Sequence, residues 1–138
     1  MKNILIIEDD SDSALLLSQY LESKGYHTAT VENGLEGLTL IKFLKPDVVV
    51  VDLALPGMDG MSLIRRLREN IYLQNKMVIV VSGHFEKFYP GNKVDGIEAD
   101  AVFSKPYNLS AVQKAILSYF KPRQQKPRPK KTAVKKSK

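Results

Sequence analysis

Residues 48–60 read VVVVDLALPGMDG, and this stretch decides the fold. Four consecutive valines are typical of a strand that is buried on both faces of a parallel β-sheet. The apolar run ends at Asp52, and the proline and glycines behind it are typical of a loop. The stretch therefore predicts a central strand that delivers a carboxylate at its carboxyl end.

The beginning of the chain repeats this pattern. Residues 4–7 (ILII) are followed directly by Glu8, Asp9 and Asp10. Because the carboxyl ends of parallel strands meet at one edge of a sheet, we expect these acids to converge with Asp52. Clustered carboxylates repel one another, so the arrangement is unfavourable unless a cation or a chemical role offsets it. These acids are therefore candidates for a functional site; strand-end acids in contact with solvent are the simpler alternative.

Strand and helix patterns alternate along the rest of the chain. Strands are predicted at residues 4–7, 27–31, 48–51, 77–81 and 101–103, and helices at residues 11–24, 35–44, 60–70 and 109–120. Prolines and glycines interrupt residues 84–100, so any helix there is predicted to be short and partly irregular. The alternation predicts an α/β fold, a doubly wound five-stranded parallel sheet with helices on both faces.

Two more polar residues follow apolar strands. Ser82 follows residues 77–81, and Lys105 closely follows residues 101–103. Oxygen ligands from carboxylates suit Mg²⁺, which also relieves their mutual repulsion. A carboxylate such as Asp52 can attack a phosphoryl group, and a cation, an ammonium and a hydroxyl can each stabilise one phosphoryl oxygen. The set therefore suits phosphoryl transfer onto Asp52.

The segments ILIIEDD, VVVVDLALPGMDG, VIVVSG and VFSKPY occur in this order. Together they resemble the receiver domain of two-component response regulators, and the resemblance covers about residues 2–120. It implies a flavodoxin-like sheet with strand order 2-1-3-4-5. It also implies a stand-alone signalling module, not a turnover enzyme, which takes a phosphoryl group from a histidine kinase or phosphotransfer protein and changes its contacts with a downstream protein.

The resemblance assigns roles to individual residues. Asp52 corresponds to the phosphoacceptor, and Glu8 and Asp9 to the acidic pair that holds Mg²⁺, with Asp9 as the expected direct ligand. The main-chain carbonyl of Ala54 is implied as a further metal ligand. Ser82 corresponds to the hydroxyl that bonds the phosphoryl group, and Lys105 to the lysine that pairs with it. The peptide bond after this lysine is typically cis in the family.

Three positions near the site need separate interpretations. Asp10 lies beside the acidic pair, and we expect it to cap the first helix, a role for which Ser11 is the alternative. The family's switch aromatic lies three residues before the lysine, where this chain has Val102. Phe103 follows it, and the alternation of side chains along a strand predicts that it points to the opposite face.

Charge divides the chain into two parts. All 15 acidic residues lie within residues 1–120, whereas 9 of the 21 basic residues lie in residues 121–138. This second part is rich in lysine and proline, so we predict a domain at residues 1–120 and a disordered basic tail at residues 121–138. The tail is a solubility segment or linker, or it contacts nucleic acid weakly and without sequence preference, an acidic protein face or anionic lipid.

The absence of cysteine excludes disulfides and thiolate metal sites, and it fits a cytoplasmic location. No apolar run approaches the length needed to span a membrane, so no membrane insertion is expected. Two alternative functions remain. One is a phosphorylation-independent interaction protein that presents the basic tail. The other, an aspartyl-nucleophile phosphohydrolase, is disfavoured because Ala54 occupies the position where such enzymes typically carry a second aspartate.

Overall fold

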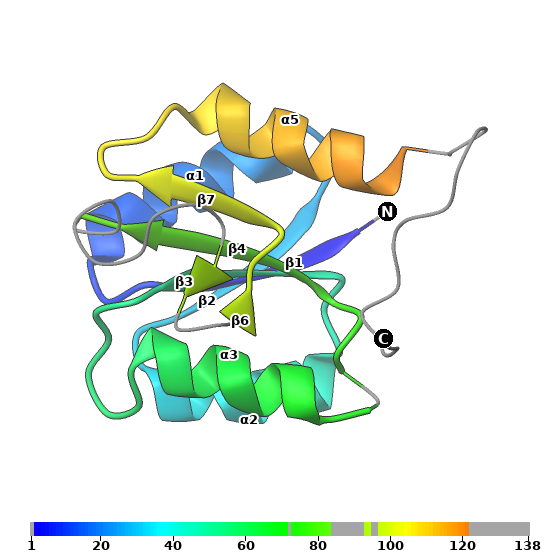
Figure 1. Cartoon of the computed structure of the whole chain (residues 1–138). Helices are drawn as coiled ribbons and strands as arrows, with labels where there is room; N and C mark the ends of the chain where they lie inside the picture. The colour runs from blue at the N-terminus through cyan, green and yellow to red at the C-terminus, as the bar shows by residue number, and fades with distance from the viewer. Residues whose placement is uncertain (1, 72, 84–92, 95–96, 122–138) are drawn as a thin grey trace.

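The computed structural model describes residues 2–71, 73–83, 93–94 and 97–121, and the structural statements below refer to these residues. Five parallel strands form one sheet with the order β2-β1-β3-β4-β7 (Figure 1), which confirms the predicted order 2-1-3-4-5. The strands are β1 (Asn3–Ile7), β2 (His27–Val31), β3 (Val48–Asp52), β4 (Met77–Ser82) and β7 (Ala101–Ser104).

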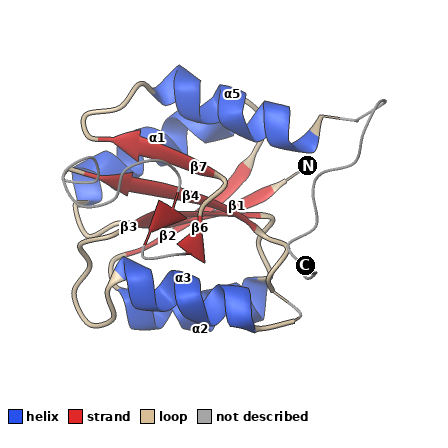
Figure 2. Ribbon diagram, in the orientation of Figure 1, coloured by secondary structure: helices blue, strands red, loops and turns tan. Residues whose placement is uncertain are grey.

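Helices cover both faces of this sheet, as Figure 2 shows. Helices α1 (Ser11–Ser23) and α5 (Leu109–Phe120) lie over one face, and α2 (Gly34–Leu44) and α3 (Gly60–Glu69) over the other. Each is preceded by a residue whose side chain accepts a hydrogen bond from a main-chain amide in the first turn, which satisfies a group that the helix leaves without a partner. These capping residues are Asp10, Asn33, Asp59 and Asn108.

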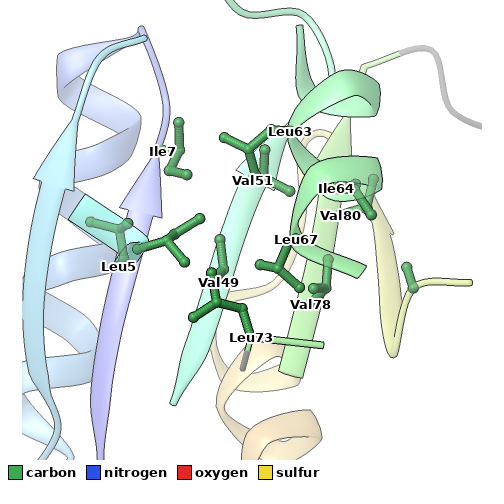
Figure 3. Packing of buried hydrophobic residues seen from close by; sticks show 12 residues of the cluster. Leu5, Ile7, Val49, Val51, Leu63, Ile64, Leu67, Leu73, Val78 and Val80 are labelled. Carbon is green, nitrogen blue, oxygen red and sulfur yellow. The ribbon is translucent and has the colours of Figure 1, made fainter. Parts of the chain in front are cut away.

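The core has two layers because successive side chains of a strand point to opposite faces. Leu5, Val49 and Val78 lie in one layer, which also contains Leu63 and Leu67 of α3 (Figure 3). The residues between them in the strands pack against α1 and α5. Every residue of β3 and β4 is buried, as the continuous apolar runs predicted.

The last strand of the sheet shows the same alternation. Val102 packs into the layer under α2 and α3, whereas Phe103 packs into the layer under α1 and α5. The prediction that Phe103 points away from the face of Val102 is therefore confirmed. The Phe103 ring lies 6.3 Å from the ring of Tyr107, measured between centroids.

The segment between β4 and β7 was predicted to contain at most a short helix. Residues 84–92 and 95–96 lie outside the described residues, so that prediction is not tested there. The described residues of this segment form two strands of two residues each, β5 (Lys93–Val94) and β6 (Ile97–Glu98), which pair antiparallel. No pattern in the sequence predicted this pairing.

Two other predictions concern the C-terminal tail and membrane insertion. Helix α5 ends at Phe120, and the predicted disorder of the tail falls on residues that the structure does not describe beyond Lys121. Among the helices that are described, none combines the length and apolar character needed to cross a lipid bilayer.

Candidate functional site

The register of the strands brings the predicted site residues to one edge of the sheet. Ile7 lies opposite Val51, so Glu8 and Asp9 emerge beside Asp52, the last residue of β3. Ser82 ends β4 and lies opposite Ser104, and Lys105 follows directly. The convergence that the sequence predicted for the acids, the serine and the lysine is therefore confirmed. It arises because parallel strands end at the same edge.

Lys105 joins the two buried carboxylates at this edge. Its ammonium donates a hydrogen bond to Asp52 Oδ2 at 2.6 Å and another to Glu8 Oε1 at 2.8 Å. The carboxylate side chains are 7% and 3% exposed, and the lysine side chain is 27% exposed. A charged group this deeply buried is stable only with an opposite charge and hydrogen bonds, which Lys105 supplies to both acids.

Main-chain amides hold the other oxygens of the same carboxylates. The amide of Ala54 donates to Asp52 Oδ1 at 2.9 Å, and the amide of Asp10 donates to Glu8 Oε2 at 3.1 Å. These bonds fix both carboxylate planes. The Asp52 oxygen that faces Lys105 is the one that does not bond to the loop. The predicted role of the Ala54 carbonyl as a metal ligand stays a prediction.

The acids can also hold a divalent cation. Glu8, Asp9 and Asp52 each offer one carboxylate oxygen, and these oxygens lie within 4.8 Å of one another. Asp9 is exposed, whereas Glu8 and Asp52 are buried. Three hard oxygen donors at this spacing fit Mg²⁺, which is held by few carboxylates and keeps several waters. The donor set of this site therefore fits the metal that the sequence predicted.

Burial and charge shift the ionisation of these groups in opposite directions. Burial raises the pKa of Glu8, while the hydrogen bond from Lys105 partly opposes this rise. Burial lowers the pKa of Lys105, but its hydrogen bonds to Asp52 and Glu8 and their charges outweigh burial and raise the pKa above its ordinary value. Lys105 therefore stays protonated, and the site contains a permanent ammonium.

Asp10 has the structural role that the sequence predicted. Its carboxylate accepts hydrogen bonds from the Ser13 hydroxyl at 2.9 Å and from the Asp12 amide at 3.2 Å, so Asp10 and not Ser11 caps α1. The hydrogen bond from Ser13 is the main reason why its pKa lies below the ordinary value. Asp10 is exposed and is not among the carboxylates grouped for a metal.

Ser82 and the peptide bond after Lys105 complete the edge. Ser82 is 5% exposed, and its carbonyl accepts a hydrogen bond from the Lys105 amide at 2.9 Å. This bond ties the end of β4 to the segment that carries the lysine. The Lys105–Pro106 peptide bond is cis, in agreement with what the family resemblance implied.

Two glycines, Gly34 and Gly60, position the Asp52 loop. A β-carbon on Gly60 would lie 2.5 Å from the carbonyl oxygen of Asp52 and 2.7 Å from the α-carbon of Leu53. A β-carbon on Gly34 would collide with the carbonyl of Met58. Glycine is a poor helix former, so its presence in the first turn of both α2 and α3 was a usable signal of close contact.

The roles of two further residues, Tyr107 and Asp100, were not predicted from the sequence. The pKa of the Tyr107 hydroxyl is raised, first by burial and then by the charge of Glu8. Asp100 was not singled out. Its carboxylate accepts hydrogen bonds from Arg68 at 2.9 Å and from the Val78 amide at 2.8 Å, so it ties α3 to the start of β4. Because Asp100 and its hydrogen-bond donors are far apart in the sequence, no local pattern indicates these contacts.

Comparisons with known proteins agree with the geometry. The sequence profile of the response regulator receiver domain matches residues 4–117. The sporulation initiation phosphotransferase F of Bacillus subtilis is 27% identical over 121 residues, which cover 86% of this chain and 94% of that protein. A solved structure of a sensor protein from Polaromonas sp. JS666 has a TM-score of 0.78 at 28% identity and covers 85% of this chain and 94% of that one.

Longer regulators match over the same region. The alkaline phosphatase synthesis transcriptional regulatory protein PhoP of Bacillus subtilis is 33% identical over 121 residues, or 84% of this chain. The match covers 48% of PhoP, so the chain spans about half of that relative.

Proposed function

The chain belongs to the family of response regulator receiver domains, and we propose that Asp52 is the residue on which it accepts a phosphoryl group. Family membership makes the chain a phosphoaccepting signalling module of a two-component phosphorelay, and it disfavours the phosphorylation-independent alternative. The observation that carries the assignment of Asp52 is its contact with Lys105. Asp52 Oδ2 lies 2.6 Å from the ammonium nitrogen, at the edge where Glu8 and Asp9 also converge.

We propose that a phosphoryl group passes from a histidine nitrogen of the donor to the Asp52 carboxylate. Asp52 Oδ2 attacks the phosphorus of a phosphohistidine, and a new P–O bond forms while the P–N bond breaks. The histidine nitrogen keeps the electron pair of the broken bond. Positioning of the Asp52 carboxylate by the Ala54 amide supports this step, because phosphoryl transfer depends mainly on orientation and charge neutralisation.

Lys105 and Ser82 have distinct roles in this proposal. Lys105 bridges Asp52 and Glu8 before transfer, and its ammonium is near enough to pair with the phosphoryl oxygens that Asp52 gains. Its raised pKa supports this role, since the charge persists at neutral pH. Ser82 lies at the end of the next strand, and its hydroxyl would donate to another phosphoryl oxygen.

Glu8, Asp9, Asp52 and the Ala54 carbonyl are the groups that would hold Mg²⁺. The bound metal would neutralise the negative charge that accumulates on the phosphoryl oxygens. Exposed Asp9 is a better candidate for a direct ligand than buried Glu8, because Mg²⁺ keeps several waters and an exposed carboxylate leaves room for them.

The partners follow from the family and are proposed in general terms. The donor is a histidine kinase or a phosphotransfer protein, and the downstream target is a protein that responds to a change in the receiver's surface. Receiver domains are signalling modules, and we propose that this one modifies itself without turning over a substrate. The cytoplasmic location stays a prediction.

Beryllofluoride, which mimics an aspartyl-bound phosphoryl group, provides the test. Titrating it with Mg²⁺ into the full chain should shift the amide NMR signals of Asp52, Ser82 and Lys105. The Asp52→Asn variant is the matched control, because it keeps the shape of the side chain and removes the charge. Shifts that persist in this variant, or no shift in the native chain, would rule out Asp52 as the acceptor.

A further inference from the structure

The two ends of the sheet carry opposite charge. The edge with the carboxyl ends of the strands is surrounded by exposed acids at Asp9, Asp10, Asp12, Glu32, Glu36 and Asp59. Lysines gather at the other end, where the strands begin and the helices finish: Lys2, Lys24, Lys42, Lys45, Lys76 and Lys121. Figure 1 shows that the end of α5 and the N-terminus both lie at this second end, opposite the tips of β4 and β7.

The described acids at the lysine-rich end are fewer: they are Glu22, Asp47, Glu69 and Asp100. Asp47 accepts a hydrogen bond from the Asn3 amide, and Glu22 accepts one from Thr28. Asp100 is paired with Arg68. The hydrogen bonds to Asp47 and Glu22 come from neutral donors and leave both charges in place, but the lysines still outnumber the acids, so this end carries a surplus of positive charge. We call it the basic pole and define it by Lys42, Lys45, Arg66 and Lys76.

Large apolar side chains are exposed within the basic pole. Phe43 is 80% exposed, Ile71 is 69% exposed and Leu44 is 44% exposed. Phe43 and Leu44 end α2, and Ile71 follows α3 closely. One groove at this end is lined by Leu38, Lys42, Arg66, Glu69, Asn70 and Leu73. Phe43 and Ile71 each follow a groove-lining residue in the chain, and the groove itself carries two basic side chains and one acidic one.

We propose that the basic pole docks on an anionic lipid surface. Lysine and arginine are attracted to the lipid phosphates, and Phe43, Leu44 and Ile71 can enter the boundary between headgroups and acyl chains. A nucleic acid backbone would use the positive charge but would leave the apolar side chains in water. The combination of charge and exposed apolar area thus favours a bilayer, bound at its surface and not spanned.

The last described residue lies at the same end of the sheet (Figure 1). Helix α5 ends at Phe120, and the chain leaves it through Lys121 at this end. Residues 122–138 contain eight further lysines and arginines and no acid. The acidic edge lies at the opposite end and would be repelled by anionic lipid, so docking would leave Asp52 facing away from the membrane. This inference does not depend on phosphorylation.

A single introduced tryptophan provides a direct test, because the native chain contains no tryptophan. The full-length Phe43→Trp variant is mixed with phosphatidylcholine vesicles that contain or lack phosphatidylglycerol. Its emission should shift to shorter wavelength only with the anionic vesicles. Leu16→Trp is the matched control, since Leu16 is 60% exposed on α1, outside the pole, and should not shift. No shift at position 43, or an equal shift in both variants, would overturn the proposal.

Cosedimentation with the same vesicles separates docking of the pole from attraction of the tail. The double variant Phe43→Ser with Ile71→Ser should reduce the partition coefficient by about tenfold, because it removes the inserted apolar area. Lys42→Gln should reduce it by about fivefold. Unchanged partitioning of the double variant would overturn the proposal. Tighter binding of duplex DNA than of vesicles, unaffected by the double variant, would assign the pole to nucleic acid and also overturn it.

Discussion

Replacing Lys105 with methionine tests how much its positive charge stabilises the two buried carboxylates of the site. Methionine keeps most of the apolar stem and removes the ammonium that bonds to Asp52 and Glu8. Both carboxylates then remain buried, next to each other, without their positive partner. We therefore expect the variant to fold with a clearly lower free energy of unfolding.

The size of this loss follows from the exposure of the three groups. Removing one partner of a fully buried ion pair costs about 3–5 kcal/mol, whereas exposed pairs contribute at most about 1 kcal/mol. The two carboxylate side chains are 7% and 3% exposed, but that of Lys105 is 27% exposed, so solvent screens part of the interaction. We expect a loss of about 3 kcal/mol near neutral pH, at the lower end of the buried range.

The loss should depend on pH in a direction set by Glu8. Burial raises the pKa of this carboxyl group in the folded protein, and the hydrogen bond from Lys105 opposes the rise. Without Lys105 the pKa rises further, so the folded variant binds a proton more tightly than the unfolded chain. The stability deficit is therefore fully present above this raised pKa and shrinks as the pH falls through it, because protonated Glu8 no longer needs a cation.

Urea denaturation at several pH values, with and without Mg²⁺, measures these effects. Mg²⁺ should stabilise the variant more than the native chain, because Lys105 no longer competes for the same carboxylates. Lys114→Met is the matched control: Lys114 is exposed on α5, so this change should alter stability by less than about 0.5 kcal/mol. A deficit for Lys105→Met no larger than that of the control, or one that grows as the pH falls, would refute the reasoning.

Three further changes test other parts of the structure. Gly60→Ala should destabilise by about 2 kcal/mol in urea, since its β-carbon would lie 2.5 Å from the carbonyl oxygen that ends β3, whereas Gly83→Ala, with open space around it, should change little. Asp100→Ala should cost about 3 kcal/mol in the same assay because it leaves Arg68 and a buried amide without this acceptor; a loss below 1 kcal/mol would contradict that role. Asp10→Asn tests acid sensitivity by thermal melting. Because the pKa of Asp10 is lowered in the folded protein, its stabilisation is present above the unfolded pKa and is lost as the pH falls. The variant should therefore lose less stability in acid than the native chain, and parallel pH profiles of the two proteins would contradict this.

Local patterns predicted most of the framework because they reflect short-range physics. The continuous apolar runs of β3 and β4 correspond to strands that are buried on both faces. Alternation along β7 placed Val102 and Phe103 in different layers. The capping role of Asp10 follows from its position before a helix, and the structure confirms it.

The site was predictable to the extent that parallel strands share an edge. Its residues could be named because each follows an apolar run, but their contacts could not. Lys105 reaches Glu8 across 97 positions of sequence and Asp52 across 53. No local pattern indicates that one ammonium will bridge both acids, since this depends on how far β7 extends beside β4.

The sequence by itself determined the five strands of the parallel sheet, the two core layers and the chemical types at the functional edge, because each depends on neighbouring residues or on the period of the apolar pattern. Tertiary structure alone decided the close contact of Gly60 with the end of β3, the bond between Arg68 and Asp100, and the gathering of Lys42, Phe43 and Ile71 at one pole. These features join segments that are distant in the chain. Their geometry is fixed only when the helices pack on the sheet, because the packed core permits few relative positions.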